Sequence, residues 1–337
     1  MTTPVTTTAA TRDPALAQIC DAIRERQRFL ITSHARPDGD SIGSQLALAY
    51  ALQLLGKDVR LVNADPAPEH YLEFPGVERI EIAREVVDND ADAVIVMESG
   101  DFARTGVKGL EGRFTINIDH HQGNSRYGNI NWLDESAAAC GELVFDLIRA
   151  LGVPLTLDIA THIYLAILTD TGSFHHSNIT PRTFDICRQT VEAGVQPAAM
   201  ARRVFDSNSF GKLKLIGALL DEMELVAGGR LAVLYLNDEI LHATGTTYND
   251  TEGLINLPLT AREIQAVVFF KVGADGDVRV SMRSKYDVDV RRVADRHGGG
   301  GHKNAAGFTV HQPLKDVKAG ILREITEAVE VGLQSRP

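Results

Sequence analysis

The sequence predicts an α/β protein with a doubly wound, mainly parallel sheet in an N-terminal domain, a helical linker, and a smaller α+β domain at the C-terminal end. Short apolar runs in the first half are continuous and rich in β-branched residues, which is typical of parallel strands covered on both faces. Amphipathic helical patterns alternate with these runs, as in doubly wound folds. The length of 337 residues exceeds one ordinary domain, so two domains are expected.

The first half of the chain is predicted to hold four strands and four helices. The strands are expected at residues 28–34, 59–63, 92–99 and 114–121. A helix is expected at 41–56, ending at Gly56, because glycine commonly follows the last helical residue. Three further helices are expected at 139–152, 157–172 and 181–194, the last with Pro181 at its first position.

The second half begins after a helical pattern from about 197 to 226, which the glycines of "AGGR" at 227–230 interrupt. Strands are then expected at 231–236, 264–273, 277–285 and 307–311, with a polar loop at 242–253. A short helix is expected at 288–296 and a last helix at 314–333. The predicted organisation is a disordered tail (1–14), a catalytic domain (15–195), a helical linker (196–228) and a substrate-binding domain (229–335).

Composition narrows the classes of partner and compartment. A net charge of −11 argues against tight, non-specific binding of long duplex nucleic acid, which needs a large cationic surface. The three cysteines (Cys20, Cys140 and Cys187) lie far apart, which favours reduced thiols and a cytoplasmic protein. The N-terminal residues lack a secretory pattern, and no stretch of 18 apolar residues predicts a membrane span.

Four clusters of acids and histidines fall where predicted strands or helices end. Ligands of open parallel sheets bind outside the carboxyl ends of the strands, so the clusters are expected to meet there. Each cluster alone has an ordinary alternative: Asp40 or Ser41 could cap a helix, and "ESGDFAR" could be a solvated loop. The candidate residues are His34, Asp38 and Asp40; Glu98, Asp101 and Arg104; Asp119, His120 and His121; and Asp170.

The mixture of side chains predicts a pair of metal ions. Two histidines and four carboxylates without cysteine favour Mn²⁺ over structural Zn²⁺, with Mg²⁺ or Co²⁺ as alternatives. Six ligands exceed what one ion usually takes from protein while leaving room for substrate. Two ions about 3.5–4 Å apart would use them all and would suit phosphoryl transfer.

Four motifs resemble the DHH phosphoesterase superfamily with its DHH-associated C-terminal domain. They are "HARPDGDSIGS", "DHH", "TDTGSF" and "GGGGHKNAAGF", in the family's order and covering about residues 15 to 330. The compact length is similar to the NrnA-type enzymes of that superfamily. The resemblance implies hydrolysis of very short oligonucleotides and of 3′-phosphoadenosine 5′-phosphate.

The resemblance also implies roles for single residues. His34 and Asp38 would hold a first ion, and Asp40, His120 and Asp170 a second. His121 would face the scissile phosphate, and Asp119 would orient the neighbouring histidine. The family usually has Asp in the position that bridges both ions, where this chain has Glu98, so the metal spacing or preference is expected to shift. Asp101 is an alternative ligand.

The glycine-rich stretch "RHGGGGHKNAAGF" is either a flexible hinge or an anion-binding loop, because glycines let backbone N–H groups approach a phosphate. The resemblance favours a loop that grips the end of the substrate away from the cleaved phosphate. From 271 to 303 there are eight Lys or Arg against five Asp, which suits a short anionic nucleotide. The expected substrate contacts are Arg283, Ser284, Gly299, Gly300, Gly301, His302 and Lys303.

The expected activity is therefore a two-metal phosphoesterase acting on short oligonucleotides or 3′-phosphoadenosine 5′-phosphate. Arg104 would steady the phosphate, although a solvated loop arginine is the alternative. The competing functions are a cyclic dinucleotide phosphodiesterase, a manganese pyrophosphatase and a nucleotide-binding regulator with a degenerate site. The apolar helical region 139–226 is compatible with a homodimer interface and equally with the core of one chain.

Overall fold

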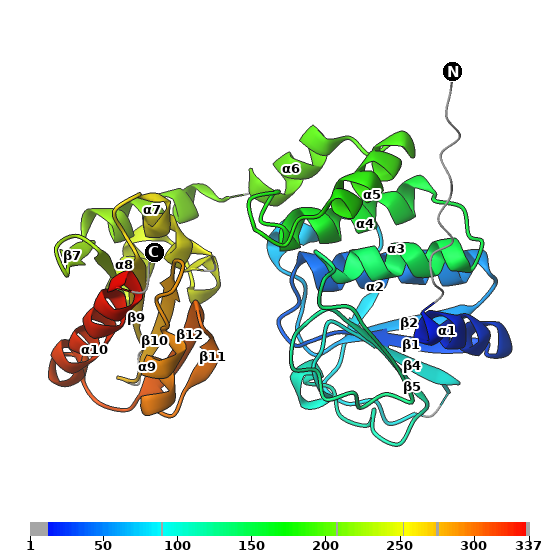
Figure 1. Ribbon diagram of the computed structural model, residues 1–337, viewed down its shortest axis with the longest axis horizontal. Coiled ribbons are helices and arrows are strands. Elements are labelled where there is room, and N and C mark those ends of the chain that lie inside the picture. The colour runs from blue at the N-terminus through cyan, green and yellow to red at the C-terminus, as the bar shows by residue number, and fades with distance from the viewer. Residues whose placement is uncertain (1–12, 89, 207, 252, 274–275, 335–337) are drawn as a thin grey trace. The chain divides into compact units, whose positions relative to one another are not determined.

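The computed structural model describes residues 13–334 except 89, 207, 252 and 274–275. The chain divides into two compact units, residues 1–207 and 208–337, which are coloured blue to green and yellow-green to red in Figure 1. Of the tail expected at 1–14, residues 1–12 lie outside the described part, and helix α1 already begins at Pro14.

The first unit contains the elements α1 Pro14–Glu25, β1 Arg28–Thr32, α2 Gly39–Leu54, β2 Asp58–Asn63, β3 Ile80–Ile82, β4 Ala93–Met97, β5 Thr115–Asp119, β6 Ile130–Leu133, α3 Cys140–Ala150, α4 Leu157–Asp170, α5 Pro181–Glu192 and α6 Pro197–Phe205. Short 3₁₀ turns lie at Glu69–Tyr71, Val77–Arg79 and Ala103–Thr105. The four predicted strands and four predicted helices are all present. The strands β3 and β6 and the helix α1 were not predicted.

The first sheet has the order β3-β2-β1-β4-β5-β6, and each of its strand pairings is parallel. The order reverses between β1 and β4, where the chain leaves one half of the sheet for the other. Such a reversal leaves a crevice outside the carboxyl ends of the two strands, where α/β proteins bind ligands. The predicted α/β fold class is confirmed.

The two faces of this sheet are covered by different structures. Helices α1 to α4 pack on one face, around a core that includes Ile31, Leu46 and Ile163, and Figure 1 shows α2 and α3 lying across the strands. Loop residues such as Val86 and Leu110 cover the other face. The strands are buried on both sides, which explains why their apolar runs are continuous rather than alternating.

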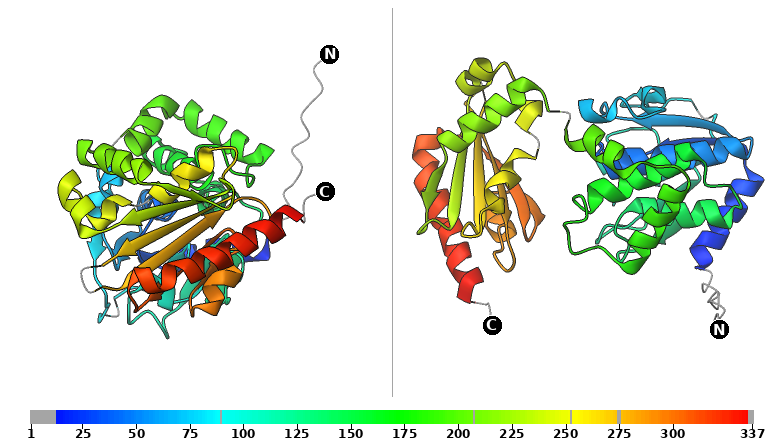
Figure 2. Two further views of the ribbon diagram at one scale, coloured as in Figure 1. Left: turned by 90° about the vertical axis from the view of Figure 1, so that its left-hand side faces the viewer. Right: turned by 90° about the horizontal axis from the view of Figure 1, so that it is seen from above.

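The second unit contains α7 Phe210–Asp221, β7 Glu224–Val226, β8 Leu231–Leu236, α8 Asp238–Thr244, β9 Ala266–Val272, β10 Val278–Ser284, α9 Arg291–Arg296, β11 Gly300–His302, β12 Ala305–Val310 and α10 Leu314–Gln334, with 3₁₀ turns at Tyr248–Thr251 and Leu254–Thr260. Its sheet has the order β11-β12-β10-β9-β8-β7, with only the β8–β9 pairing parallel. Helix α10 packs on one face of this sheet through Ile321, Ile325 and Val329. Figure 2 draws this helix in red.

Three predictions for the second half differ from the structure. The helical pattern expected up to 226 is interrupted between α6 and α7, and residues 224–226 form the edge strand β7. The expected polar loop at 242–253 contains the end of α8 and a 3₁₀ turn. Part of the glycine-rich loop forms strand β11, which pairs with β12 in an antiparallel hairpin. None of the helices in the described part of the chain combines the length and apolar character needed to cross a bilayer.

Candidate metal centre and phosphate-binding site

The loop after β1 carries the first candidate residues. Asp38 is the N-cap of α2, and its Oδ1 accepts from the Ser41 N–H at 2.9 Å, in a capping box with Ser41. Its other oxygen, Oδ2, lies 3.6 Å from His34 Nε2. The cap therefore belongs to Asp38 rather than to Asp40 or Ser41, the residues for which capping was the alternative. It occupies only one of the two Asp38 oxygens.

Asp40 lies in the first turn of α2 and is only 1% exposed. Its Oδ1 accepts hydrogen bonds from Ser44 Oγ (2.8 Å) and the Gly141 N–H (3.1 Å), and its Oδ2 from the Cys140 N–H (2.7 Å). The N-terminus of α3, which carries partial positive charge, thus holds this carboxylate. Gly141 lets α3 pack closely against α4, since a Cβ at Gly141 would lie 2.6 Å from the Ala166 Cβ of α4.

Glu98 follows directly after β4 and is 1% exposed. Its backbone φ is +57°, a left-handed conformation that is uncommon for residues other than glycine. Its Oε1 lies 3.5 Å from His120 Nε2, and its Oε2 lies 3.7 Å from His121 Nδ1. Glu98 therefore faces both histidines of the "DHH" stretch.

The stretch Asp119-His120-His121 ends β5 and begins the loop after it. His120 Nδ1 lies 3.0 Å from the Ala137 carbonyl oxygen, so Nδ1 carries the proton and Nε2 faces the acids. Asp119 is fully buried, and its Oδ1 accepts from the His120 N–H (2.8 Å), the His121 N–H (3.1 Å) and His121 Nδ1 (2.8 Å). Asp119 thereby fixes the orientation of the His121 ring.

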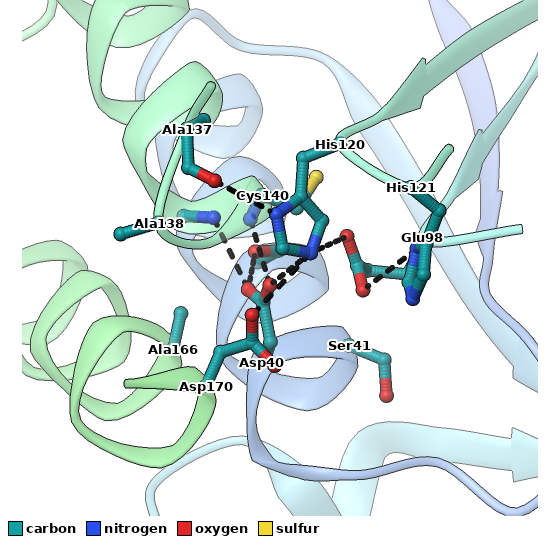
Figure 3. Close-up of polar contacts among 12 residues, drawn as sticks. Asp40, Ser41, Glu98, His120, His121, Ala137, Ala138, Cys140, Ala166 and Asp170 are labelled. Atoms are coloured by element: carbon teal, nitrogen blue, oxygen red, sulfur yellow. Dashed lines mark hydrogen bonds and ion pairs between the residues drawn. The ribbon is translucent and has the colours of Figure 1, made fainter. Parts of the chain in front are cut away.

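Asp170 is the last residue of α4, and its Oδ2 lies 3.4 Å from His120 Nε2. Figure 3 shows that Asp40, Glu98 and Asp170 converge on this nitrogen from α2, β4 and α4. Within the described residues, two groups offer ligand atoms within 4.8 Å of one another: Asp40, His120 and Asp170; and Glu98, His120 and His121. His120 belongs to both groups.

The electrostatics of the cluster show an excess of buried negative charge. Burial raises the pKa of Asp40 well above its usual value, and the neighbouring acids Glu98 and Asp170 add to the shift. Burial likewise raises the pKa of Asp170 to about 6, against the opposing effect of His120. Burial would lower the pKa of His120, but the three carboxylates around it raise that pKa to about 11. The positive charge of His120 alone therefore does not balance the negative charge of the carboxylates buried around it.

These residues fit a divalent metal centre. Glu98 Oε1 is buried and accepts no hydrogen bond within the described residues. The His120 tautomer, fixed by the Ala137 carbonyl, presents Nε2, as metal-ligating histidines commonly do. Carboxylate and imidazole ligands without thiolate favour Mn²⁺ or a similar ion. A cation among Asp40, Glu98 and Asp170 would remove the unfavourable concentration of negative charge.

Several candidate residues of the first unit lie outside the two groups. His34 and Asp38 face each other as a pair. Asp101 uses its Oδ1 to accept from the Arg104 N–H at 2.8 Å, so one of its oxygens stabilises the 3₁₀ turn at 103–105. Arg104 is exposed and its guanidinium forms no ion pair among the described residues. That leaves it available to an anion.

The candidate residues of the second unit lie around the β11–β12 hairpin and the end of β10. Ser284 Oγ donates to the Val288 carbonyl at 2.7 Å and accepts from Asn304, so it stabilises the local fold. Lys303 Nζ donates to Asp287 Oδ1 at 2.7 Å. Arg283 is partly buried, donates to the Met282 carbonyl, and burial lowers its pKa.

The three candidate glycines differ from one another. A Cβ at Gly299 would lie 2.2 Å from the Gly307 carbonyl oxygen, and a Cβ at Gly301 would lie 2.4 Å from that of Ala305. A Cβ at Gly300 would meet open space. Backbone packing within the hairpin thus accounts for Gly299 and Gly301. Gly300 and the exposed His302 have no such structural explanation.

Sequence reasoning missed the side chains that support the ligands. Ser44 donates to Asp40, and Asn124 Nδ2 donates to Asp119 Oδ2 at 2.7 Å. Asn124 lies three residues after His121 in "NIDHHQGN", and its proximity to the motif was an available signal. The Cys140 and Gly141 N–H groups gave no sequence signal, since they lie a hundred residues from Asp40.

The chain is similar to known proteins over most of its length. The profile of the DHH family, N-terminal domain, matches residues 28–167, and that of the DHHA1 domain matches residues 228–331. The chain is 34% identical over 304 residues to the bifunctional oligoribonuclease and PAP phosphatase NrnA of Thermus thermophilus, covering 88% of this chain and 90% of the relative. A probable bifunctional oligoribonuclease and PAP phosphatase NrnA of Streptococcus mutans is 30% identical over 298 residues, covering 87% and 93%.

A crystal structure with a similar fold is that of an exopolyphosphatase-related protein from Bacteroides fragilis. Its TM-score is 0.87 at 24% identity, covering 95% of this chain and 97% of that one. At this identity the likeness concerns the fold alone. It extends over both units of the chain.

Proposed function

This chain belongs to the DHH family, and on that premise we propose that it is a two-metal phosphoesterase that hydrolyses very short oligonucleotides to mononucleotides and 3′-phosphoadenosine 5′-phosphate to AMP. The observation that carries the proposal is the convergence of Asp40, Glu98 and Asp170 on His120 Nε2, at 3.8, 3.5 and 3.4 Å. The relatives named as oligoribonuclease and PAP phosphatase span most of this chain, which supports the choice of substrates.

The proposed metal ligands follow from the family's motifs and from the contacts. His34 and Asp38 would contribute to one ion, and Asp40, His120 and Asp170 to the other. Glu98 would bridge the two ions, since its two oxygens face in different directions, one towards His120 and one towards His121. We propose Mn²⁺ as the ion, because the ligands are oxygen and imidazole.

The bound ions would supply positive charge that acidifies water and stabilises the phosphoryl oxygens during hydrolysis. The chain's own residues bind and orient the substrate. His121 donates from Nδ1 to Asp119, which raises the pKa of the imidazole, and the protonated ring would donate from Nε2 to a phosphate oxygen. Arg104 lies in the loop after β4 and would add a charged donor to that phosphate.

The second unit would bind the remainder of the nucleotide. Arg283, Gly300 and His302 are the proposed contacts that have no complete structural explanation of their own. Lys303, which is 50% exposed, would exchange Asp287 for a phosphate at modest cost, since exposed ion pairs are weak. Ser284, Gly299 and Gly301 would act mainly by shaping the hairpin and the end of β10.

The test is one hydrolysis panel with Mn²⁺: an RNA dinucleotide, a five-mer, a twenty-mer, 3′-phosphoadenosine 5′-phosphate, a cyclic dinucleotide and pyrophosphate. Fast cleavage of the short RNAs and of the bisphosphate, with a slow twenty-mer, is expected. Selective hydrolysis of the cyclic dinucleotide or of pyrophosphate would replace the proposed substrate. Inactivity on all six with metal bound would favour a nucleotide-binding regulator, the outcome that Glu98 in the usual Asp position would explain.

The same preparations test the ion and the oligomeric state. Mn²⁺, Mg²⁺ and Co²⁺ are compared at equal concentration on the dinucleotide, with Mn²⁺ expected to give the highest rate. Light scattering of the purified chain tests whether the helical region 139–226 forms a homodimer interface or only the core of one chain. A mass of one chain, 36.6 kDa, would refute the homodimer.

A further inference from the structure

The backbone of Glu98 needs support from its surroundings. A left-handed conformation is unfavourable for a residue with a Cβ, so φ = +57° persists only where neighbouring contacts favour it. The Glu98 N–H donates to the Ile118 carbonyl at 3.1 Å, which continues the pairing of β4 with β5. The residues after Glu98 must then be held in the direction that this φ imposes.

Residues 124–127, which we call the 124–127 clamp, hold Ser99 and Gly100, the two residues after Glu98. Asn124 Nδ2 and Tyr127 Oη both donate to the Ser99 carbonyl, at 3.1 and 2.8 Å. The Ser125 N–H and Ser125 Oγ both donate to the Gly100 carbonyl, each at 2.9 Å. Four hydrogen bonds therefore fix the two peptide carbonyls that directly follow Glu98.

Asn124 has a second set of partners on the other side. Its Nδ2 donates to Asp119 Oδ2 at 2.7 Å, and its Oδ1 accepts from Asn117 Nδ2 at 2.8 Å. Asp119 in turn accepts from His121 Nδ1 through its other oxygen. One amide group thus joins the loop that carries Glu98 to the carboxylate that orients His121.

We propose that Asn124 is a positioning residue that fixes Glu98 and His121 relative to each other, 3.7 Å apart between Oε2 and Nδ1. It acts on one side of the metal centre only. Asp40, on the other side, is held independently by Ser44 and the N-terminus of α3.

The inference rests on the proposed function, because Glu98 and His121 matter in this way only if they serve a metal and a phosphate. Its test is metal binding rather than turnover alone. Isothermal titration of Mn²⁺ into metal-free protein gives the number of ions and both affinities. Electron paramagnetic resonance of the loaded protein reports the magnetic coupling between two Mn²⁺ ions, which depends on the bridging carboxylate.

Asn124→Ala is expected to weaken Mn²⁺ binding by tenfold or more, since Glu98 would bridge both ions, and to change the coupled spectrum. Asn129→Ala is the matched control: Asn129 Oδ1 accepts from the Thr115 N–H, at the far end of β5 from Asp119. It removes an asparagine from the same segment without touching Glu98 or His121, and should leave both sites and the spectrum unchanged.

Tyr127→Phe keeps the test decisive if Asn124→Ala fails to fold. It removes only the hydrogen bond to the Ser99 carbonyl, and a two- to fivefold weakening of Mn²⁺ binding is expected. Unchanged Mn²⁺ affinities and an unchanged spectrum in the folded variants would overturn the proposal. A wild-type protein that binds two ions but cleaves no substrate would refute the proposed function and leave the positioning result standing.

Discussion

The two motif-bearing regions of the chain, the acid and histidine cluster of the first unit and the glycine-rich hairpin of the second, satisfy their polar groups differently. In the hairpin, Gly299 and Gly301 are explained by close backbone contacts, and Lys303 and Ser284 have partners nearby. In the cluster, three carboxylates share one imidazole, and a buried Glu98 oxygen accepts no hydrogen bond in the described chain. Buried charge that the protein leaves uncompensated is thus stronger evidence of a ligand than a glycine-rich motif.

The largest expected effect is that of removing one charge from the cluster. Asp170→Asn should lower turnover by about 1000-fold or more, because a proposed metal ligand and its charge are lost. The same change should stabilise the metal-free protein. The folded-state pKa of Asp170, about 6, lies above the usual 3.8, so ionisation above pH 6 opposes folding.

Calorimetry of the metal-free protein at pH 8 measures this gain, which should be on the order of 1 kcal/mol. Asp158→Asn is the control, an exposed acid in the first turn of the same helix, and it should slightly destabilise by weakening the helix N-terminus. A metal-free Asp170→Asn protein that unfolds more easily than wild type would contradict the assignment of surplus negative charge.

The second expected effect separates the glycines of the hairpin. Gly301→Ala should cost about 2 kcal/mol or more of unfolding free energy, because φ is +134° there and the new Cβ would lie 2.4 Å from the Ala305 carbonyl oxygen. Gly300→Ala should change stability by less than about 0.5 kcal/mol, since its Cβ meets open space.

Denaturant unfolding and KM for the dinucleotide, measured on both variants, sharpen the comparison of the two regions. If the hairpin binds substrate, Gly300→Ala should raise KM severalfold at unchanged stability. Unchanged KM would leave the hairpin as local structure only. Equal stability losses in the two variants would contradict the contacts described for Gly301.

The sequence was sufficient to predict the parallel sheet, the strand ends that carry the acids, and the residues that meet at His120. Apolar runs and their spacing determine the sheet and its strand ends locally, whereas the grouping of Asp40, Glu98 and Asp170 with His120 followed from the resemblance to a known family. It was insufficient for β3 and β6, whose three and four residues are too short for a period to be recognised.

The support of the ligands was likewise not predictable, for a different reason. Asp40 is held by the backbone N–H groups at positions 140 and 141. The left-handed Glu98 is followed by the carbonyls of Ser99 and Gly100, which accept hydrogen bonds from the 124–127 clamp. Backbone donors carry no residue signature, and a positive φ at glutamate goes against local preference. Only the tertiary arrangement determines them.

A smaller effect is expected from placing Asp, the family's usual residue, at position 98, the proposed bridging position. Glu98→Asp removes one methylene and suits a left-handed backbone better, since Asp adopts that conformation more readily than Glu. The fold should be kept, and the ratio of Mn²⁺-supported to Mg²⁺-supported rates should change by about tenfold, because Mg²⁺ demands stricter geometry. An unchanged ratio would mean that the length of residue 98 does not set the ion preference.

A further expected effect is on how the stability of the metal-free protein depends on pH. In the metal-free protein His120 faces Asp40, Glu98 and Asp170, which raise its pKa to about 11, from an ordinary value of 6.5. The stability that its charged form contributes is complete below pH 6.5 and is lost as pH rises towards 11. Metal-free protein should therefore lose up to about 1 kcal/mol per pH unit between pH 7 and 9.

Mn²⁺ should largely abolish this pH dependence, because the ion takes the place of the His120 proton among the same acids. Thermal unfolding at pH 7, 8 and 9 measures how stability changes with pH in the metal-free and in the Mn²⁺-loaded protein. His120→Gln should flatten the pH dependence of the metal-free protein and leave that of the loaded protein unchanged. A metal-free slope that survives in His120→Gln would move its origin elsewhere in the chain. A slope that disappears both in this variant and on adding Mn²⁺ would show that a proton and the metal ion compete for His120 Nε2. No such competition is expected in the hairpin region of the second unit, where Ser284 and Lys303 have protein partners.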